Sequence, residues 1–150
     1  MKEVDKSLDD IYLFHLDKTY KQYKKFKKDF FKNLDLDLTS DQWIVLKRIS
    51  EKEGINQKDL ADSTFKEPAS VTRILDILSR KGYIERRGTL QDRRVFELFL
   101  TEAGKAVVDK VIPAALAGRA KGIEGFSAAE VQQLIDLLDR LHHNFSSDTE

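Results

Sequence analysis

The side chains with the widest scope for chemistry gather between residues 66 and 73, where basic, small and hydroxyl-bearing residues follow one another. They are Lys66, Ala69, Ser70, Thr72 and Arg73. Small residues let a helix backbone approach base edges in the major groove, and hydroxyl groups hydrogen-bond to bases or phosphates. An arginine can contact O6 and N7 of guanine together, which is worth about 1–3 kcal/mol of discrimination between bases. This combination is typical of a helix that reads DNA.

The segment 68–82 has the signals of a helix that would hold these side chains outward. It opens with a proline, which is accepted in the first helical turn, and ends at a glycine, which commonly follows the last one. Its apolar face consists of Val71, Ile74, Leu75 and Leu78. Burying that face turns Ala69, Ser70 and Arg73 outward. Surface arginines also simply solvate a helix, and this alternative stays open for Arg73 and Arg80.

Two short strands are predicted next, over Tyr83–Arg86 and Val95–Leu100, because apolar, β-branched and aromatic residues are frequent in both. The polar stretch 87–94 separates them, and Gly88 permits its turn. The hairpin tip then carries Asp92, Arg93 and Arg94. Consecutive arginines suit the narrow, strongly negative minor groove of DNA. Aspartate is also common in ordinary turns, so a purely structural tip stays open.

Capping patterns mark the helices that must position these two elements. Their N-caps are Thr39, Asn56, Thr101 and Ser127, and the first and last belong to capping boxes. The helix after Thr101 contains Pro113, which predicts a kink or break near Ile112. The first 53 residues contain neither glycine nor proline, and apolar residues from Leu8 to Leu34 recur at helical spacing. The lysines of this first helix are interpreted as a solvated face, with a functional basic patch as the alternative.

Composition excludes several classes of protein. The chain has 150 residues and no net charge, yet residues 63–100 carry eight basic side chains against five acidic ones. No cysteine is present, and His15, His142 and His143 lack metal-binding spacing, so we expect neither a metal site nor a cofactor. Nucleophile-elbow and phosphate-loop motifs are missing, which argues against an enzyme. No apolar run is long enough for a membrane span or signal peptide, so the expected location is the cytoplasm.

The segment from Leu38 to Thr101 resembles the MarR family of bacterial winged helix-turn-helix regulators. The motifs that carry the resemblance are Leu60-Ala61, Ser70-Val71-Thr72-Arg73, Lys81-Gly82-Tyr83-Ile84-Glu85-Arg86, Asp92-Arg93-Arg94 and Leu100-Thr101-Glu102-Ala103-Gly104. Each motif alone is weak, but their order and spacing are specific. Pro113 and the Ser127 cap extend the likeness over nearly the whole chain.

The resemblance implies a mainly α fold with a small β-hairpin wing. A winged helix-turn-helix domain at 38–101 would lie between dimerisation helices at 1–37 and 102–150, as one intertwined unit. It implies a homodimeric transcriptional regulator, most commonly a repressor, bound to a pseudopalindromic double-stranded operator. Apolar stripes in the terminal helices need a burial partner, which a two-fold dimer supplies.

Roles for single residues also follow from the resemblance. Ser70, Thr72 and Arg73 would read the major groove, while Arg94 would enter the minor groove with Asp92 orienting it. Arg93 would contact phosphate.

Members of the family often bind small, frequently aromatic and acidic effectors between the dimerisation helices and the winged domain. Tyr12, His15 and Trp43 are candidates for such a pocket, and core packing or dimer contact is the alternative for each. Phe99 departs from the family pattern and is expected either to pack on a helix or to border a cavity. The absence of cysteine removes the peroxide sensing that some members use.

A winged-helix scaffold that binds protein rather than DNA is the main competing hypothesis. The zero net charge favours it slightly. The arginines at 73, 93 and 94 favour DNA, because the core of a protein interface is depleted in charge.

Overall fold

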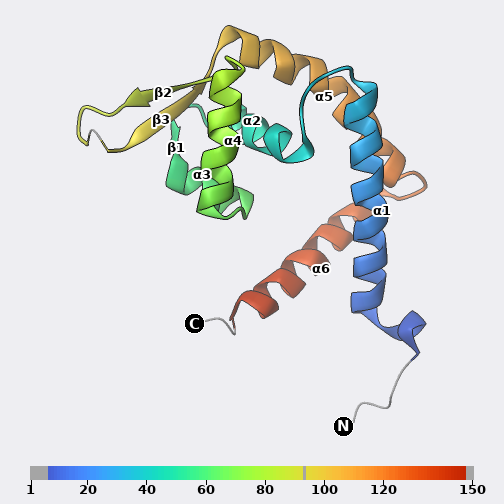
Figure 1. The fold of residues 1–150 in the computed structure, drawn as a ribbon. Coiled ribbons are helices and arrows are strands. Elements are labelled where there is room, and N and C mark those ends of the chain that lie inside the picture. The colour runs from blue at the N-terminus through green and yellow to red at the C-terminus, as the bar shows by residue number, and fades with distance from the viewer. Residues whose placement is uncertain (1–6, 93, 148–150) are drawn as a thin grey trace. The chain divides into compact units, whose positions relative to one another are not determined.

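The computed structural model describes residues 7–92 and 94–147, and it has the predicted architecture, mainly helical with a small β wing (Figure 1). Its elements are η1 (Leu8–Asp10), α1 (Tyr12–Asn33), α2 (Ser40–Glu51), β1 (Ile55–Asn56), α3 (Gln57–Thr64), α4 (Pro68–Arg80), β2 (Ile84–Gly88), β3 (Phe96–Leu100), α5 (Glu102–Gly122) and α6 (Ala128–Ser147). The chain divides into two compact units, and the boundary between them in the sequence lies between Val111 and Ile112.

Local capping chemistry starts the helices where the sequence predicts. Thr39 and Gln42 form a complete capping box, in which each side chain bonds the other residue's backbone N–H at 3.2 Å. At α6, Ser127 and Glu130 make the same reciprocal pair, at 2.8 and 3.1 Å. Each box satisfies N–H groups that the first helical turn otherwise leaves without partners.

The wing is a three-stranded antiparallel sheet in the order β1-β3-β2. Strands β2 and β3 pair from Ile84 opposite Leu100 to Gly88 opposite Phe96, so β2 runs two residues beyond its predicted end. Figure 1 shows this hairpin extending away from α2, α3 and α4. Strand β1 was not predicted, because two residues are too few to show an alternating pattern. It pairs with the base of β3, where Ile55 faces Leu98.

One apolar core in the first unit holds the helices and the sheet together. Its largest fully buried side chains are Val45, Leu46, Ile49, Leu60, Val71, Leu75, Leu78, Leu98 and Val111. Three of them come from α4, which confirms that this helix buries one face, although Ile74 of the predicted stripe is only half-buried. Because α4 is fixed by that face, its opposite side is left for other contacts.

Two helix predictions need correction. The N-terminal apolar pattern is interrupted at Ile11, which has an extended backbone between the short 3-10 turn η1 and α1. Pro113 does not break α5, which is helical from Glu102 to Gly122. A proline removes one backbone hydrogen bond while the neighbouring bonds still form, so a helix can continue through it. The boundary between the two units nevertheless lies immediately before Ile112.

The second unit contains the end of α5 and all of α6, and α6 buries none of its described residues within the single chain. Its exposed apolar side chains include Leu134, Ile135, Leu137, Leu138 and Phe145, each 41–59% exposed. Among the described helices, none is both long enough and apolar enough to cross a membrane.

Candidate nucleic-acid interface

Helices α3 and α4 form a helix-turn-helix whose connecting turn is set by local backbone geometry. Asn56 caps α3 by accepting a hydrogen bond from the Asp59 N–H at 2.8 Å. The helix ends at Phe65, whose left-handed backbone (φ 54°, ψ 37°) reverses the chain before Pro68 opens α4. This turn determines which side of α4 faces outward.

The outward face of α4 brings together four of the predicted site residues. Ala69, Thr72 and Arg73 are exposed and Ser70 is half-buried. An Arg73 guanidinium nitrogen lies 3.5 Å from the Ser70 hydroxyl oxygen, a long contact that leaves the other guanidinium donors available. Small side chains beside one arginine allow close approach to a polar surface such as a base-pair edge.

The Thr72 hydroxyl is already engaged within the domain. It donates to the Pro68 carbonyl at 3.1 Å and accepts from the Gln57 side-chain amide at 2.6 Å. A hydroxyl has one proton, so Thr72 cannot also donate to a phosphate in this arrangement. Its methyl group remains suited to contact a thymine methyl.

Gln57 is a residue that sequence reasoning missed. It is the first residue of α3, and its bond to Thr72 places its amide at the junction between the two helices. The only sequence signal for Gln57 was its position at the start of a helix, next to the Asn56 cap. Its contact with Thr72 spans 15 residues of sequence and leaves no local pattern. Backbone N–H groups at a helix start also favour phosphate oxygens.

Lys66 is held differently from the other predicted DNA contacts. Its ammonium group lies 2.6 Å from the Asp41 carboxylate, and its side chain is only 15% exposed. The structure therefore places Lys66 against the start of α2 rather than with Arg73 on the outer face of α4. Its contact with DNA stays a prediction.

The wing tip is ordered by hydrogen bonds around Asp92. The Asp92 carboxylate accepts from the backbone N–H of Arg94 at 2.9 Å, and the Thr89 hydroxyl donates to the Asp92 carbonyl at 2.8 Å. Arg94 is exposed. Arg93 lies outside the described residues. The turn thus holds the Arg94 backbone in place while the side chain remains accessible.

An ion pair joins the wing to the recognition face. The Arg86 guanidinium lies 2.8 Å from the Asp76 carboxylate, which links β2 to the outer side of α4. Arg87 covers the Phe99 ring, with 4.1 Å between its guanidinium carbon and the ring centroid. A Cβ added at Gly54 would lie 3.5 Å from the same ring. Phe99 therefore lies between Arg87 and the Gly54 turn.

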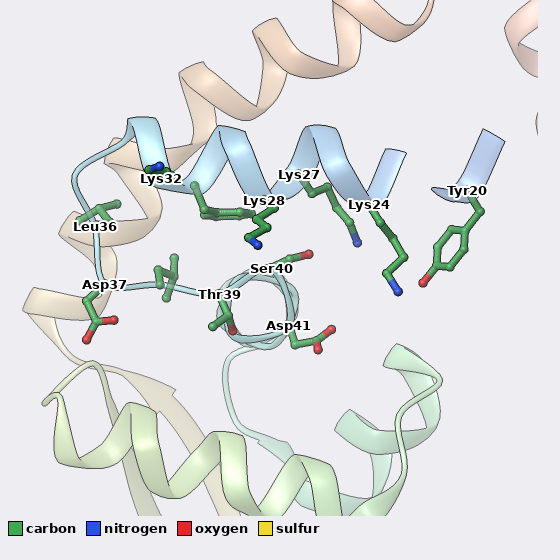
Figure 2. Close-up of a pocket in the computed structure, with 12 residues that line it drawn as sticks. Tyr20, Lys24, Lys27, Lys28, Lys32, Leu36, Asp37, Thr39, Ser40 and Asp41 are labelled. Atoms are coloured by element: carbon green, nitrogen blue, oxygen red, sulfur yellow. The ribbon is translucent and has the colours of Figure 1, made fainter. Parts of the chain in front are cut away.

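The three effector candidates are spread over two helices. Tyr12 is 55% exposed, while the His15 ring nitrogen lies 2.6 Å from the Asp9 carbonyl oxygen and Trp43 of α2 is half-buried. A pocket between α1 and α2 is lined by other residues, including Tyr20 and several lysines (Figure 2). Across the described part of the chain, no group of three or more metal-ligating side chains occurs.

Comparison with known proteins adds evidence that is independent of these contacts. The model of the MarR family matches residues 38–96. The structure of the transcriptional regulator SlyA has 26% identity and a TM-score of 0.79, with 91% of this chain and 95% of that chain covered. A mutant MarR from E. coli complexed with operator DNA has 25% identity and a TM-score of 0.77, with 92% and 99% covered. BpsR of Bordetella bronchiseptica, whose DNA binding is regulated by 6-hydroxynicotinic acid, matches in fold with 20% identity, a TM-score of 0.83, and 98% and 100% covered.

Proposed function

Because this chain belongs to the MarR family of DNA-binding transcriptional regulators, we propose that it reads a pseudopalindromic operator as a homodimer and represses transcription. The observation that carries this proposal is the outward face of α4, where small residues adjoin Arg73 and an ion pair connects the helix to the wing. Such a face fits the major groove, while the wing reaches the flanking backbone.

Within this proposal, the two reading elements have different tasks. Ser70, Thr72 and Arg73 distinguish bases, with Arg73 making the bidentate contact to guanine. Arg94 enters the minor groove from the turn that Asp92 holds, and Arg93 contacts phosphate. Loss of the first group removes sequence preference, whereas loss of the second weakens binding to every sequence.

The exposed apolar side of α6 supports the homodimer. Five side chains of this helix are 41–59% exposed in the single chain, and a soluble surface rarely leaves so many large apolar groups in water. Residues 1–37 and 102–150 would bury this surface against a second copy around a winged domain at 38–101. Two-fold symmetry then places two copies of α4 about one helical turn of DNA apart, roughly 10 base pairs.

Selection of binding sites from random duplex DNA, at two salt concentrations, tests the proposal. We expect enrichment of an inverted repeat and a steep loss of affinity with salt, because phosphate contacts release counterions. Salt-dependent binding without enrichment would contradict sequence-specific reading, and no binding at all would favour the protein-interaction scaffold.

Two arginine variants then test the assignment of sites. Arg73→Ala should abolish preference for the selected operator at a cost of about 1–3 kcal/mol, and Arg94→Ala should lower the salt slope by about one. Arg119→Ala, in the last turn of α5, is the matched control because it removes the same charge elsewhere. Operator binding by Arg73→Ala and Arg94→Ala that equals binding by the control would refute the sites without refuting the family.

We further propose that a small aromatic or acidic effector binds in a pocket near Tyr12, His15 and Trp43 and thereby causes the protein to release its operator. BpsR supports this suggestion, since that protein's DNA binding responds to 6-hydroxynicotinic acid. Displacement of labelled operator by such compounds, measured for the wild-type protein and for the Trp43→Ala variant, tests this pocket. Equal displacement in the two proteins would argue against this pocket.

A further inference from the structure

Gln57, the first residue of α3, is joined to the outer face of α4 by a side-chain hydrogen bond. Its amide nitrogen Nε2 lies 2.6 Å from the Thr72 hydroxyl oxygen, although 15 residues separate the two in the sequence. Thr72 is exposed on the face that carries Arg73, and Gln57 is half-buried. A side chain of α3 therefore reaches the surface that the proposed function assigns to α4 alone.

The hydrogen bonds of Thr72 determine which way the Gln57 amide points. The single hydroxyl proton of Thr72 goes to the Pro68 carbonyl at 3.1 Å, so the Gln57 atom that meets this hydroxyl must be a donor. The amide nitrogen therefore faces Thr72 with one of its two N–H groups. Among the described residues, no other side-chain hydrogen bond involves Gln57. Its second N–H and its carbonyl oxygen Oε1 are thus left as a donor beside an acceptor.

A donor beside an acceptor is the pattern that matches adenine. In the major groove, adenine offers N7 as an acceptor and the N6 amino group as a donor, and a glutamine amide binds both at once. Guanine offers two acceptors and cytosine only a donor, so neither base satisfies both amide groups. The methyl group of Thr72 suits a thymine methyl. The two side chains together therefore fit A·T base pairs.

The first turn of α3 is less suited to phosphate, which is the other partner for an amide at a helix start. The Asp59 carboxylate accepts a hydrogen bond from the Asn56 side-chain amide at 3.0 Å, so this turn already carries a negative charge. That charge complements the positive end of the helix dipole and repels a phosphate. Lys58, which is exposed, is the side chain of this turn that attracts phosphate.

We propose that Gln57 is a base-reading residue for adenine and that Thr72 positions its amide. This inference rests on the proposed function and adds a residue of α3 to the reading face of α4. The Thr72 hydroxyl takes one N–H of Gln57, which holds the other N–H and Oε1 for N7 and N6 of adenine. Each half-site of the operator then contains an A·T pair read by Gln57, in addition to the guanine read by Arg73.

Selection of binding sites with variants at residue 57 tests the base contact. Gln57→Ala should lose roughly 5- to 150-fold of preference for A·T at one position of each half-site and keep the preferences elsewhere. Gln57→Glu should replace that adenine by cytosine, because a carboxylate accepts a hydrogen bond from the cytosine N4 amino group. Lys58→Gln, the matched control in the same helical turn, should leave every base preference unchanged.

The result for Gln57→Glu separates a base contact from a phosphate contact. If Gln57 lay against phosphate, the new carboxylate would weaken binding to every sequence alike and shift no preference, which would overturn the proposal. Preferences equal to wild type in both variants would also overturn it. A wild-type protein that binds no DNA would refute the proposed function and this contact together, whereas an operator whose selection ignores residue 57 would refute this contact alone.

Two variants of Thr72 test its positioning role, because each keeps one half of the side chain. Thr72→Val keeps a methyl group and removes the hydroxyl, so the adenine preference should fall by about fivefold, the equivalent of one hydrogen bond. Thr72→Ser keeps the hydroxyl and removes the methyl group, so the adenine preference should persist. An adenine preference that survives Thr72→Val unchanged would show that Gln57 reads without this anchor and would overturn the positioning role.

The same two variants give a readout in the protein without DNA. One side-chain N–H of Gln57 should have an NMR chemical shift that Thr72→Val changes and Thr72→Ser preserves, because only the first removes the acceptor. This measurement is independent of operator binding and therefore of the proposed function. Identical Gln57 amide signals in the wild type and in Thr72→Val would overturn the hydrogen bond as the positioning contact.

Discussion

Replacing Gly104 by alanine tests the joint at which the wing meets α5. Gly104 is buried in the first turn of α5, and a Cβ there would lie 2.0 Å from the Tyr83 carbonyl oxygen and 2.9 Å from its carbon. Ordinary carbon–oxygen contacts begin near 3.3 Å, so the backbone would have to move by more than about 1 Å. The obstacle is main chain, which cannot change rotamer to make room.

The expected cost follows from three contributions. Overpacking of this kind costs up to about 3 kcal/mol. The Tyr83 carbonyl also accepts the Thr101 N–H at 3.0 Å, and losing that bond adds about 1 kcal/mol. Alanine regains about 1 kcal/mol through its higher helix propensity. The net loss of unfolding free energy is therefore about 3 kcal/mol, or roughly 6–12 °C in Tm for a protein of this size.

Chemical denaturation at fixed protomer concentration measures this loss, since a dimer's stability depends on concentration. Gly122→Ala is the matched control, because it lies in the same helix and its added Cβ meets nothing within 4 Å. We expect Gly122→Ala to be neutral or to gain up to about 1 kcal/mol. Equal stability of the two variants would refute the close approach at Tyr83.

Two further substitutions test smaller features. Asp35 follows the end of α1 with a positive φ of 52°, so Asp35→Gly should stabilise by about 0.5–1 kcal/mol in thermal unfolding, and Asp35→Asn, which removes only the charge, should gain less. No gain for glycine over asparagine would count against backbone strain there. Asp76→Asn frees Arg86 for phosphate, so it should strengthen non-specific DNA binding and steepen the salt slope by about one, whereas an unchanged slope in a salt titration would contradict this role.

Features of the fold that depend on neighbouring residues could be predicted from the sequence. The caps at Thr39, Asn56 and Ser127 act within four residues, and the buried face of α4 repeats with the helical period. The two strands of the wing were also predictable, apart from their ends. The break that Pro113 allowed near Ile112 does not occur, because the rule for a single proline does not count the hydrogen bonds that neighbouring residues keep.

The contacts of the candidate site could not be predicted from the sequence in this way, because they join distant residues. Lys66 meets Asp41 across 25 residues, and Lys81 meets Asp37 across 44. Nothing in the pattern near either lysine signals such a partner. The lysines of α1 look like a solvated face in the sequence, and only the position of the α2 start turns four of them into the wall of a pocket. The scaffold could therefore be predicted from local patterns, whereas the contacts of the site depend on charged residues that only the fold brings together.

The strand order of the wing also bears on the tendency of this protein to self-associate. Because β3 is central, β2 is an open edge, and unpaired backbone groups on such an edge can recruit the strand of another molecule. The exposed residues of β2 are Glu85, Arg86, Arg87 and Gly88, of which the first three are charged, and charges on an edge strand oppose such pairing. Arg86, which pairs with Asp76 on the recognition face, is thus also one of the charges that oppose edge-to-edge pairing, and neutralising it to alter DNA affinity would favour self-association of the wing.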